Sequence, residues 1–205
     1  MKTVRILTGA LVGALMVFSG SVFSSTVGVE LVGVSDSVPY GGAYAGFYEL
    51  KIDGTTTLAM CDDVATSISI GDTWEGIWYA QADVDAGANV KFSGPDQSVR
   101  YSQVGWLFGQ TASAVPTERA RIQAAVWNIM TPGGIAMDAT AQGYYDTATS
   151  GLYDAFVWPT GMRVLTPDPF GSAQEMLVTV PLPAAFYLFG FGIVGITLIS
   201  RRKKE

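Results

Sequence analysis

The residues best suited to chemistry in this chain are one cysteine and one glutamine. Cys61 is the single cysteine among 205 residues, and it stands at the end of a predicted strand. Gln123 lies on a predicted helix, where Trp127 at i+4 and Met130 at i+7 place it on an apolar face. Two interpretations stay open. Either Gln123 satisfies its amide with nearby backbone groups beside an inert buried thiol, or its carbonyl carbon reacts with a nucleophile.

These two segments resemble the thioester domains of bacterial surface adhesins, in which a strand cysteine and a helix glutamine form an internal thioester. The glutamine motif there is approximately Thr-Gln-x-Ala-apolar-Trp, and residues 122–127 (Ile-Gln-Ala-Ala-Val-Trp) differ from it at Ile122. Met60 and Asp62 flank Cys61 where the family has an aromatic or leucine residue and an apolar one. The resemblance implies a Cys61–Gln123 thioester that an amine or hydroxyl of a target surface opens. The carboxylates that follow Cys61 are expected to raise its pKa and so to disfavour the thiolate.

The first 25 residues have the three parts of a secretory signal peptide. Lys2 and Arg5 precede an apolar stretch, Ile6 to Phe18, and small residues follow up to Ser25. The sequence therefore predicts residues 1–25 as a cleaved leader and the following part as exported.

The C-terminal end predicts a membrane anchor. Residues 184–200 are apolar or small, and at 1.5 Å per helical residue they span roughly 25 Å, the lower limit for a bilayer. A block of four cations follows: Arg201, Arg202, Lys203 and Lys204. Such a block stays in the cytoplasm. We therefore expect a single-pass inner-membrane protein whose N-terminal side faces outward.

The segment 180–205 resembles a PEP-CTERM sorting signal, the C-terminal tag of exported proteins in Gram-negative bacteria. The matching positions are Val180, Pro181, Leu182 and Pro183, with Leu182 where the family has glutamate. The resemblance implies processing by an exosortase-type membrane protease, release to the cell surface or extracellular matrix, and association with exopolysaccharide.

Composition excludes several classes of function. Residues 26–179 form one domain-sized segment with six basic and 17 acidic residues, a net charge of −11. A surface of that sign repels nucleic acid, so we expect no nucleic-acid partner. The chain has no histidine, which excludes histidine-based acid–base catalysis and most zinc sites. No cofactor is expected.

The pattern of residues 26–179 predicts an α+β fold, a β-rich domain with a small helical group. Turn signals occur at 39–42 and at Asp53-Gly54. Strands are expected at 27–34, 46–52, 55–61 and 65–70, two more within 153–180, and a strand or helix at 74–82. Helices are expected at 98–108, at 116–130 and, shorter, within 139–152.

Other sites are weaker candidates. The acidic residues Asp62, Asp63 and Asp72, or Asp83 with Asp85, have oxygen ligands suited to Ca²⁺ but lack a recognisable loop spacing, so no metal site is predicted. Tryptophan side chains can pack in a core or stack on carbohydrate, and a core role is favoured for most of those in this chain. The tryptophans are Trp74, Trp78, Trp106, Trp127 and Trp158.

The leading hypothesis is a non-enzymatic envelope or matrix protein, in a specific version a covalent adhesin that reacts with an amine-bearing surface or exopolysaccharide. The alternatives are a polysaccharide hydrolase, which needs paired carboxylates in a cleft, and a non-covalent carbohydrate-binding module, which needs exposed aromatics on one face.

Overall fold

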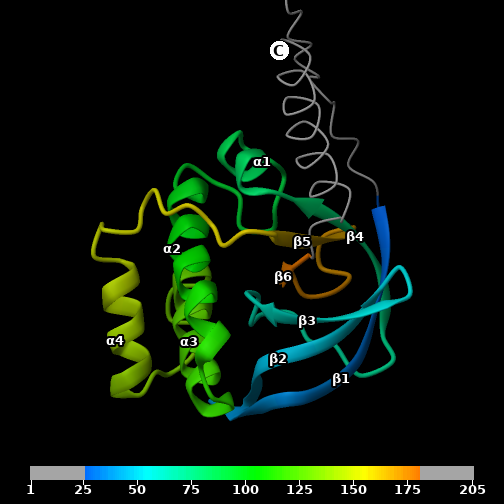
Figure 1. Cartoon of the computed structure of the whole chain (residues 1–205), viewed down its shortest axis with the longest axis horizontal. Helices are drawn as coiled ribbons and strands as arrows, with labels where there is room; N and C mark the ends of the chain where they lie inside the picture. The colour runs from blue at the N-terminus through cyan, green and yellow to red at the C-terminus, as the bar shows by residue number, and fades with distance from the viewer. Residues whose placement is uncertain (1–25, 181–205) are drawn as a thin grey trace, which may run out of the picture.

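Six antiparallel strands close into a barrel, and the helices pack together on one side of it (Figure 1). The structure is a computed structural model, and it describes residues 26–180. The predicted leader 1–25, the apolar segment 184–200, the residues Pro181 to Pro183 and the cations Arg201 to Lys204 lie outside the described residues. Within residues 26–180, no helix has the length and apolar character needed to cross a bilayer.

The strand order around the barrel is β1-β2-β3-β6-β5-β4. The strands are β1 (Thr26–Tyr40), β2 (Ala43–Ile52), β3 (Thr55–Cys61), β4 (Thr73–Tyr79), β5 (Met162–Asp168) and β6 (Met176–Thr179). The first three strands follow one another through hairpins, whereas β5 and β6 return from beyond the helices to pair with β4 and β3. This return closes the sheet and leaves it without a free edge.

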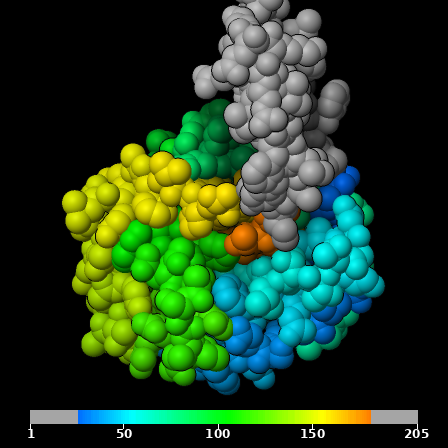
Figure 2. Space-filling model, in the orientation of Figure 1, coloured from blue at the N-terminus to red at the C-terminus, as the bar shows by residue number. Residues whose placement is uncertain are grey.

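The helical group is formed by the middle of the chain. Its elements are α1 (Gln81–Asp85), α2 (Gln97–Gln110), the short 3-10 turn η1 (Thr111–Ser113), α3 (Pro116–Met130) and α4 (Ala139–Ala148). The bounds of α3 are those predicted, because Pro116 occupies the first helical turn and Thr131 leaves the helical conformation just before Pro132 and Gly133. In the space-filling view, the helices (green to yellow) and strands β1–β3 (blue and cyan) form two halves of one face (Figure 2).

Two sequence predictions about strands were wrong. Residues 65–70 form a loop because side chains occupy their backbone groups: the Asp63 carboxylate accepts from the N–H groups of Ala65 and Thr66, and Gln174 Nε2 donates to Thr66 O. The strand predicted to end at Val34 continues to Tyr40, because irregular pairing between Leu31 and Asp36 lets β1 bend and stay paired with β2. The ambiguous segment 74–82 is strand β4 followed by the start of α1.

Alternation along β3 divides the core into two clusters. Ala59 and Cys61 pack with buried residues of the other strands and with Trp127 of α3. Met60, between them, packs with buried residues of α2 and α3. Because successive strand residues face opposite sides, β3 separates the apolar interior of the barrel from the layer that joins the barrel to the helices. Cys61 belongs to the first cluster, and the helix that carries Gln123 contacts both.

Candidate functional site: Cys61 and Gln123

Cys61 is fully buried at the C-terminal end of β3. Its pairing with Met176 of β6 fixes the backbone at this point. The thiol donates to Asp63 O with an Sγ–O distance of 2.9 Å, and Asp63 N lies 3.2 Å from the sulfur. The cysteine is therefore held by a tight turn in its own chain as well as by the sheet.

Gln123 is also fully buried, in the middle of α3. Its side-chain amide bridges two strands of the barrel. Nε2 donates to Cys61 O at 2.8 Å, and Oε1 accepts from Gly46 N of β2 at 2.5 Å. The structure thus brings together two predicted site residues that are 62 positions apart in the sequence. It also shows the satisfied amide that the inert interpretation requires.

Gly46 is the third member of the site, and its residue type and spacing in the sequence did not predict this. Its φ is +125°, and a Cβ at this position would lie 2.6 Å from Asp36 O. Both facts favour glycine, because larger residues rarely adopt this conformation and a methyl group has no room. In the sequence, Gly46 is the first residue of the strand predicted at 46–52, so it gives no clear signal. In the structure it lies inside β2, where a glycine often marks a bulge or a close backbone approach. Here that approach is to the Gln123 amide.

The surroundings of Cys61 favour the neutral thiol. Burial raises the pKa of Cys61 well above its ordinary value, and the carboxyls of Asp62 and Asp63 raise it further. The hydrogen bond from the Asp63 backbone N–H acts in the opposite direction but is outweighed. The expectation that the neighbouring carboxylates raise this pKa therefore agrees with the structure, and the thiol is protonated at neutral pH.

A buried acid pair lies on the other side of the same strand end. Asp62 and Glu175 are both fully buried, and within residues 26–180 no donor bonds the Asp62 carboxyl oxygens. Glu175 accepts from three donors: the Tyr101 hydroxyl, Thr166 Oγ1 at 2.5 Å and Lys91 N at 2.9 Å. Burial and the proximity of Glu175 raise the pKa of Asp62 well above its ordinary value. Nothing in the sequence around Glu175 distinguishes it from a surface acid.

An ion pair fixes the loop that follows Cys61. Lys91 Nζ contacts Asp63 Oδ2 and lies 2.5 Å from Thr66 Oγ1. Gln174 Nε2 donates to Asp63 O at 3.0 Å and to Thr66 O at 2.6 Å. The turn that holds the Cys61 sulfur is therefore cross-linked from two other parts of the chain. Asp63, weighed as a calcium ligand, has Lys91 as its counter-ion instead.

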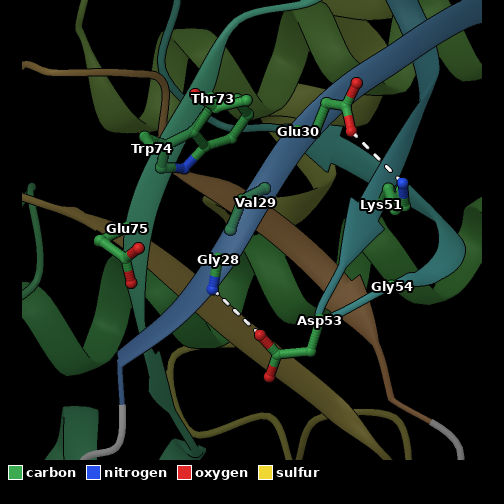
Figure 3. Close-up of a pocket in the computed structure, with 9 residues that line it drawn as sticks. All are labelled: Gly28, Val29, Glu30, Lys51, Asp53, Gly54, Thr73, Trp74 and Glu75. Atoms are coloured by element: carbon green, nitrogen blue, oxygen red, sulfur yellow. Dashed lines mark hydrogen bonds and ion pairs between the residues drawn. The ribbon is translucent and has the colours of Figure 1, made fainter.

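A surface hollow of about 510 Å³ bears on the hydrolase alternative (Figure 3). It lies over Gly28, with Asp53 on one side and Glu75 on the other. Asp53 Oδ1 accepts from Gly28 N at 3.1 Å, and Glu30 pairs with Lys51 at 3.7 Å. Two of the three carboxylates in the hollow are therefore already engaged, which does not favour an acid–base pair across a bound sugar.

The tryptophans are mostly core residues, as was predicted from the sequence. Trp74, Trp127 and Trp158 are buried. Trp106 stacks on Tyr153 with a centroid distance of 4.2 Å. Among the described aromatic residues, Tyr44 and Phe170 are the ones with large exposed side chains. Two exposed rings do not make the row of exposed aromatics on one face that the binding-module alternative requires.

No family model and no curated protein sequence matches the chain. Two solved structures are similar to it. The N-terminal thioester domain of a surface protein from Clostridium perfringens has 13% identity and a TM-score of 0.43, covering 76% of this chain and 99% of that one. The N-terminal thioester domain of the fibronectin-binding protein SfbI from Streptococcus pyogenes has 11% identity and a TM-score of 0.45, covering 80% and 97%. At these scores the similarity assigns no role to any residue of this chain.

Proposed function

We propose that this chain is an exported, surface-sorted envelope or matrix protein whose barrel domain forms an internal thioester between Cys61 and Gln123 and uses it for covalent attachment. The observation that carries the proposal is the contact between the fully buried Gln123 amide and the Cys61 backbone. The protein is not proposed to turn over a substrate, because each domain would react once.

Thioester formation exchanges one bond for another. The Cys61 sulfur adds to the Gln123 carbonyl carbon, the carbon–nitrogen bond breaks, and ammonia leaves with the thiol proton. Negative charge develops on the carbonyl oxygen during the addition. That oxygen already accepts from Gly46 N, and a fixed backbone donor at this position stabilises the charge. For the addition, the sulfur must exchange its contact with Asp63 O for one with the carbonyl carbon.

Burial supplies the protection that such a bond needs. Cys61 and Gln123 are fully buried, and Trp127, one turn further along α3, is 1% exposed. Exclusion of water prevents hydrolysis of a reactive acyl group. An amine or hydroxyl that reaches the carbonyl carbon would then form an amide or ester and return the thiol to Cys61.

The competing interpretation is an inert thiol beside a hydrogen-bonded glutamine, and intact-mass measurement of the full-length chain separates the two. A thioester makes the chain lighter by one ammonia, blocks alkylation of Cys61 after denaturation, and allows methylamine to add. Cys61→Ala and Gln123→Ala must each abolish the mass loss. Gln97→Ala is the matched control, since Gln97 is a buried helical glutamine whose Nε2 bonds Val84 O and Ala88 O away from any cysteine. An unshifted mass with a freely alkylated thiol would reject the thioester.

Export and sorting rest on the sequence of the two ends. A phosphatase that is active only outside the cytoplasm, inserted between Thr179 and Val180 with residues 180–205 retained behind it, is expected to be active. Deletion of residues 184–205 is expected to release the fusion from the membrane fraction. An inactive fusion would place the domain in the cytosol and remove the surface role together with the adhesive one.

A further inference from the structure

A pocket of about 440 Å³ opens beside the candidate thioester. Its walls come from β1, from the start of β2 and from the loop that follows Cys61. The lining residues are Leu31, Val34, Gly42, Ala43, Tyr44, Tyr48, Ser67, Ile68, Ser69, Ile70 and Gln174. No charged side chain is among them in the part of the chain that the structure describes. This neutral lining contrasts with the acidic composition of the domain.

The floor of this pocket adjoins Cys61. Tyr48 is 6% exposed and packs in the same apolar cluster as Cys61. Gln174, which lines the pocket, donates to Asp63 O, and the Cys61 thiol donates to the same carbonyl oxygen. The pocket and the sulfur are therefore connected through Gln174 and the Asp63 carbonyl oxygen. The 510 Å³ hollow over Gly28 has no such link to Cys61.

Gln174 presents an acceptor without a donor. Its Nε2 is committed to Asp63 O and Thr66 O, which fixes the orientation of the amide. Its Oε1 is buried and has no hydrogen-bond partner within residues 26–180, and the residue is 8% exposed. A buried polar atom left without a partner is costly, so it points to a ligand that completes the bond. That ligand must donate an O–H or N–H.

We propose that this pocket seats a carbohydrate, whose hydroxyl donates to Gln174 Oε1 and is thereby placed to attack the Gln123 acyl carbon. This inference rests on the proposed function for its covalent step. The neutral lining disfavours an ammonium group, which would be desolvated without a carboxylate beside it. Tyr44, 56% exposed at the rim, offers an aromatic face for a sugar ring. In the covalent step the hydroxyl oxygen bonds to the acyl carbon, the carbon–sulfur bond breaks, and the hydroxyl proton passes to the Cys61 sulfur.

Docking can be measured without the thioester. Full-length Cys61→Ala protein, in a detergent whose headgroup is not a sugar, is mixed with maltotriose, cellotriose or chitotriose. Saturation transfer from the protein to the sugar is recorded by NMR. At least one sugar is expected to show transfer, which falls at least threefold in Tyr44→Ala. This substitution keeps the Tyr44 carbonyl that accepts from Tyr48 Oη at 2.5 Å. Phe170→Ala removes an exposed ring, 47% accessible, that does not line the pocket, and transfer should be unchanged.

The covalent step, transfer of the Gln123 acyl group to the sugar, is measured on chains that carry the thioester. Adduct formation with the docking sugar is followed by intact mass in Tyr44→Ala and Phe170→Ala, with methylamine as a small nucleophile that needs no docking. We expect a sugar adduct that forms about three- to tenfold more slowly in Tyr44→Ala and methylamine adducts at equal rates. The carbohydrate pocket is overturned if none of the three sugars receives saturation transfer. It is also overturned if Tyr44→Ala and Phe170→Ala show equal saturation transfer and equal rates of sugar adduct formation. A full-length chain that never loses ammonia refutes the thioester instead and leaves the docking result to stand by itself.

Discussion

The buried acid pair gives the sharpest test of the electrostatics beside Cys61. Glu175 accepts from Tyr101, Thr166 and Lys91, whereas no donor in residues 26–180 bonds the Asp62 oxygens. Two like charges in contact and out of water cannot both persist. Burial raises the pKa of both acids, but three hydrogen bonds stabilise the ionised form of Glu175, so Asp62 holds the proton. In Asp62→Asn, the new side chain has the same shape as the Asp62 side chain. Its amide N–H can donate to Glu175, and it does not titrate.

The size of the effect follows from proton linkage. Because the pKa of Asp62 is raised in the folded chain, the folded state binds one more proton than the unfolded state between the ordinary carboxyl pKa, about 4, and the raised value. In that window the wild-type free energy of unfolding falls by about 1.4 kcal/mol per pH unit as the pH rises. The stabilising contribution of the pair is complete below the window and is lost above it. Asp62→Asn removes this slope.

The assay is urea unfolding followed by tryptophan fluorescence between about pH 5 and about pH 8. The difference in stability between Asp62→Asn and wild type should grow in favour of the variant as the pH rises. Asp146→Asn, at an exposed acid of α4, is the matched control and should follow wild type. Glu175→Gln should be less stable than wild type by about 1–3 kcal/mol, since its neutral amide replaces a carboxylate that accepts three bonds. Parallel curves for wild type and Asp62→Asn would refute the shared-proton account.

Glycine and cap substitutions test other parts of the structure. Gly46→Ala should lower the free energy of unfolding by about 1–3 kcal/mol and slow the ammonia loss. Gly42→Ala, also at positive φ (+91°) but with open space around it, should lose only the free energy of the backbone strain. Urea unfolding and intact-mass measurement compare the two variants. Gly105→Ala in α2 would place Cβ 2.4 Å from Trp158 and should lower the free energy of unfolding, whereas Gly143→Ala in α4, with nothing within 4 Å, should raise it by about 0.5–1 kcal/mol. Asp138 caps α4 by accepting from Ala141 N at 2.8 Å, so Asp138→Ala should cost about 0.5–2 kcal/mol in the same unfolding assay.

The sequence was informative where structure is local. Helix α3 was predicted with its observed bounds because Pro116 and the Pro132-Gly133 pair act on the backbone within one turn. Barrel closure was not predicted, because it depends on pairing of β3 with β6 and of β4 with β5 across the whole helical segment. A pattern of single strands carries no information about such partners.

The candidate site shows the same division. Cys61 and Gln123 stand out by residue type and by the apolar spacing around Gln123, and the structure places them in contact. Gly46, Glu175 and Gln174 contribute through long-range contacts from β2 and from the segment before β6. Their neighbours in the sequence give no periodicity that would identify them. The supporting residues of this site therefore became visible only once the fold was known.

Three departures from ordinary folding rules lie around the Cys61 strand end. Asp62 buries a carboxyl beside another acid, Gln174 has a buried oxygen without a donor in residues 26–180, and Gly46 adopts a backbone conformation that larger residues rarely adopt. Apolar side chains of similar volume would often be as stable as a buried ionic group or more stable. An inert cysteine in an apolar cluster requires none of these neighbours. Three such departures beside one another fit the pattern expected where chemistry, and not stability alone, sets the residues.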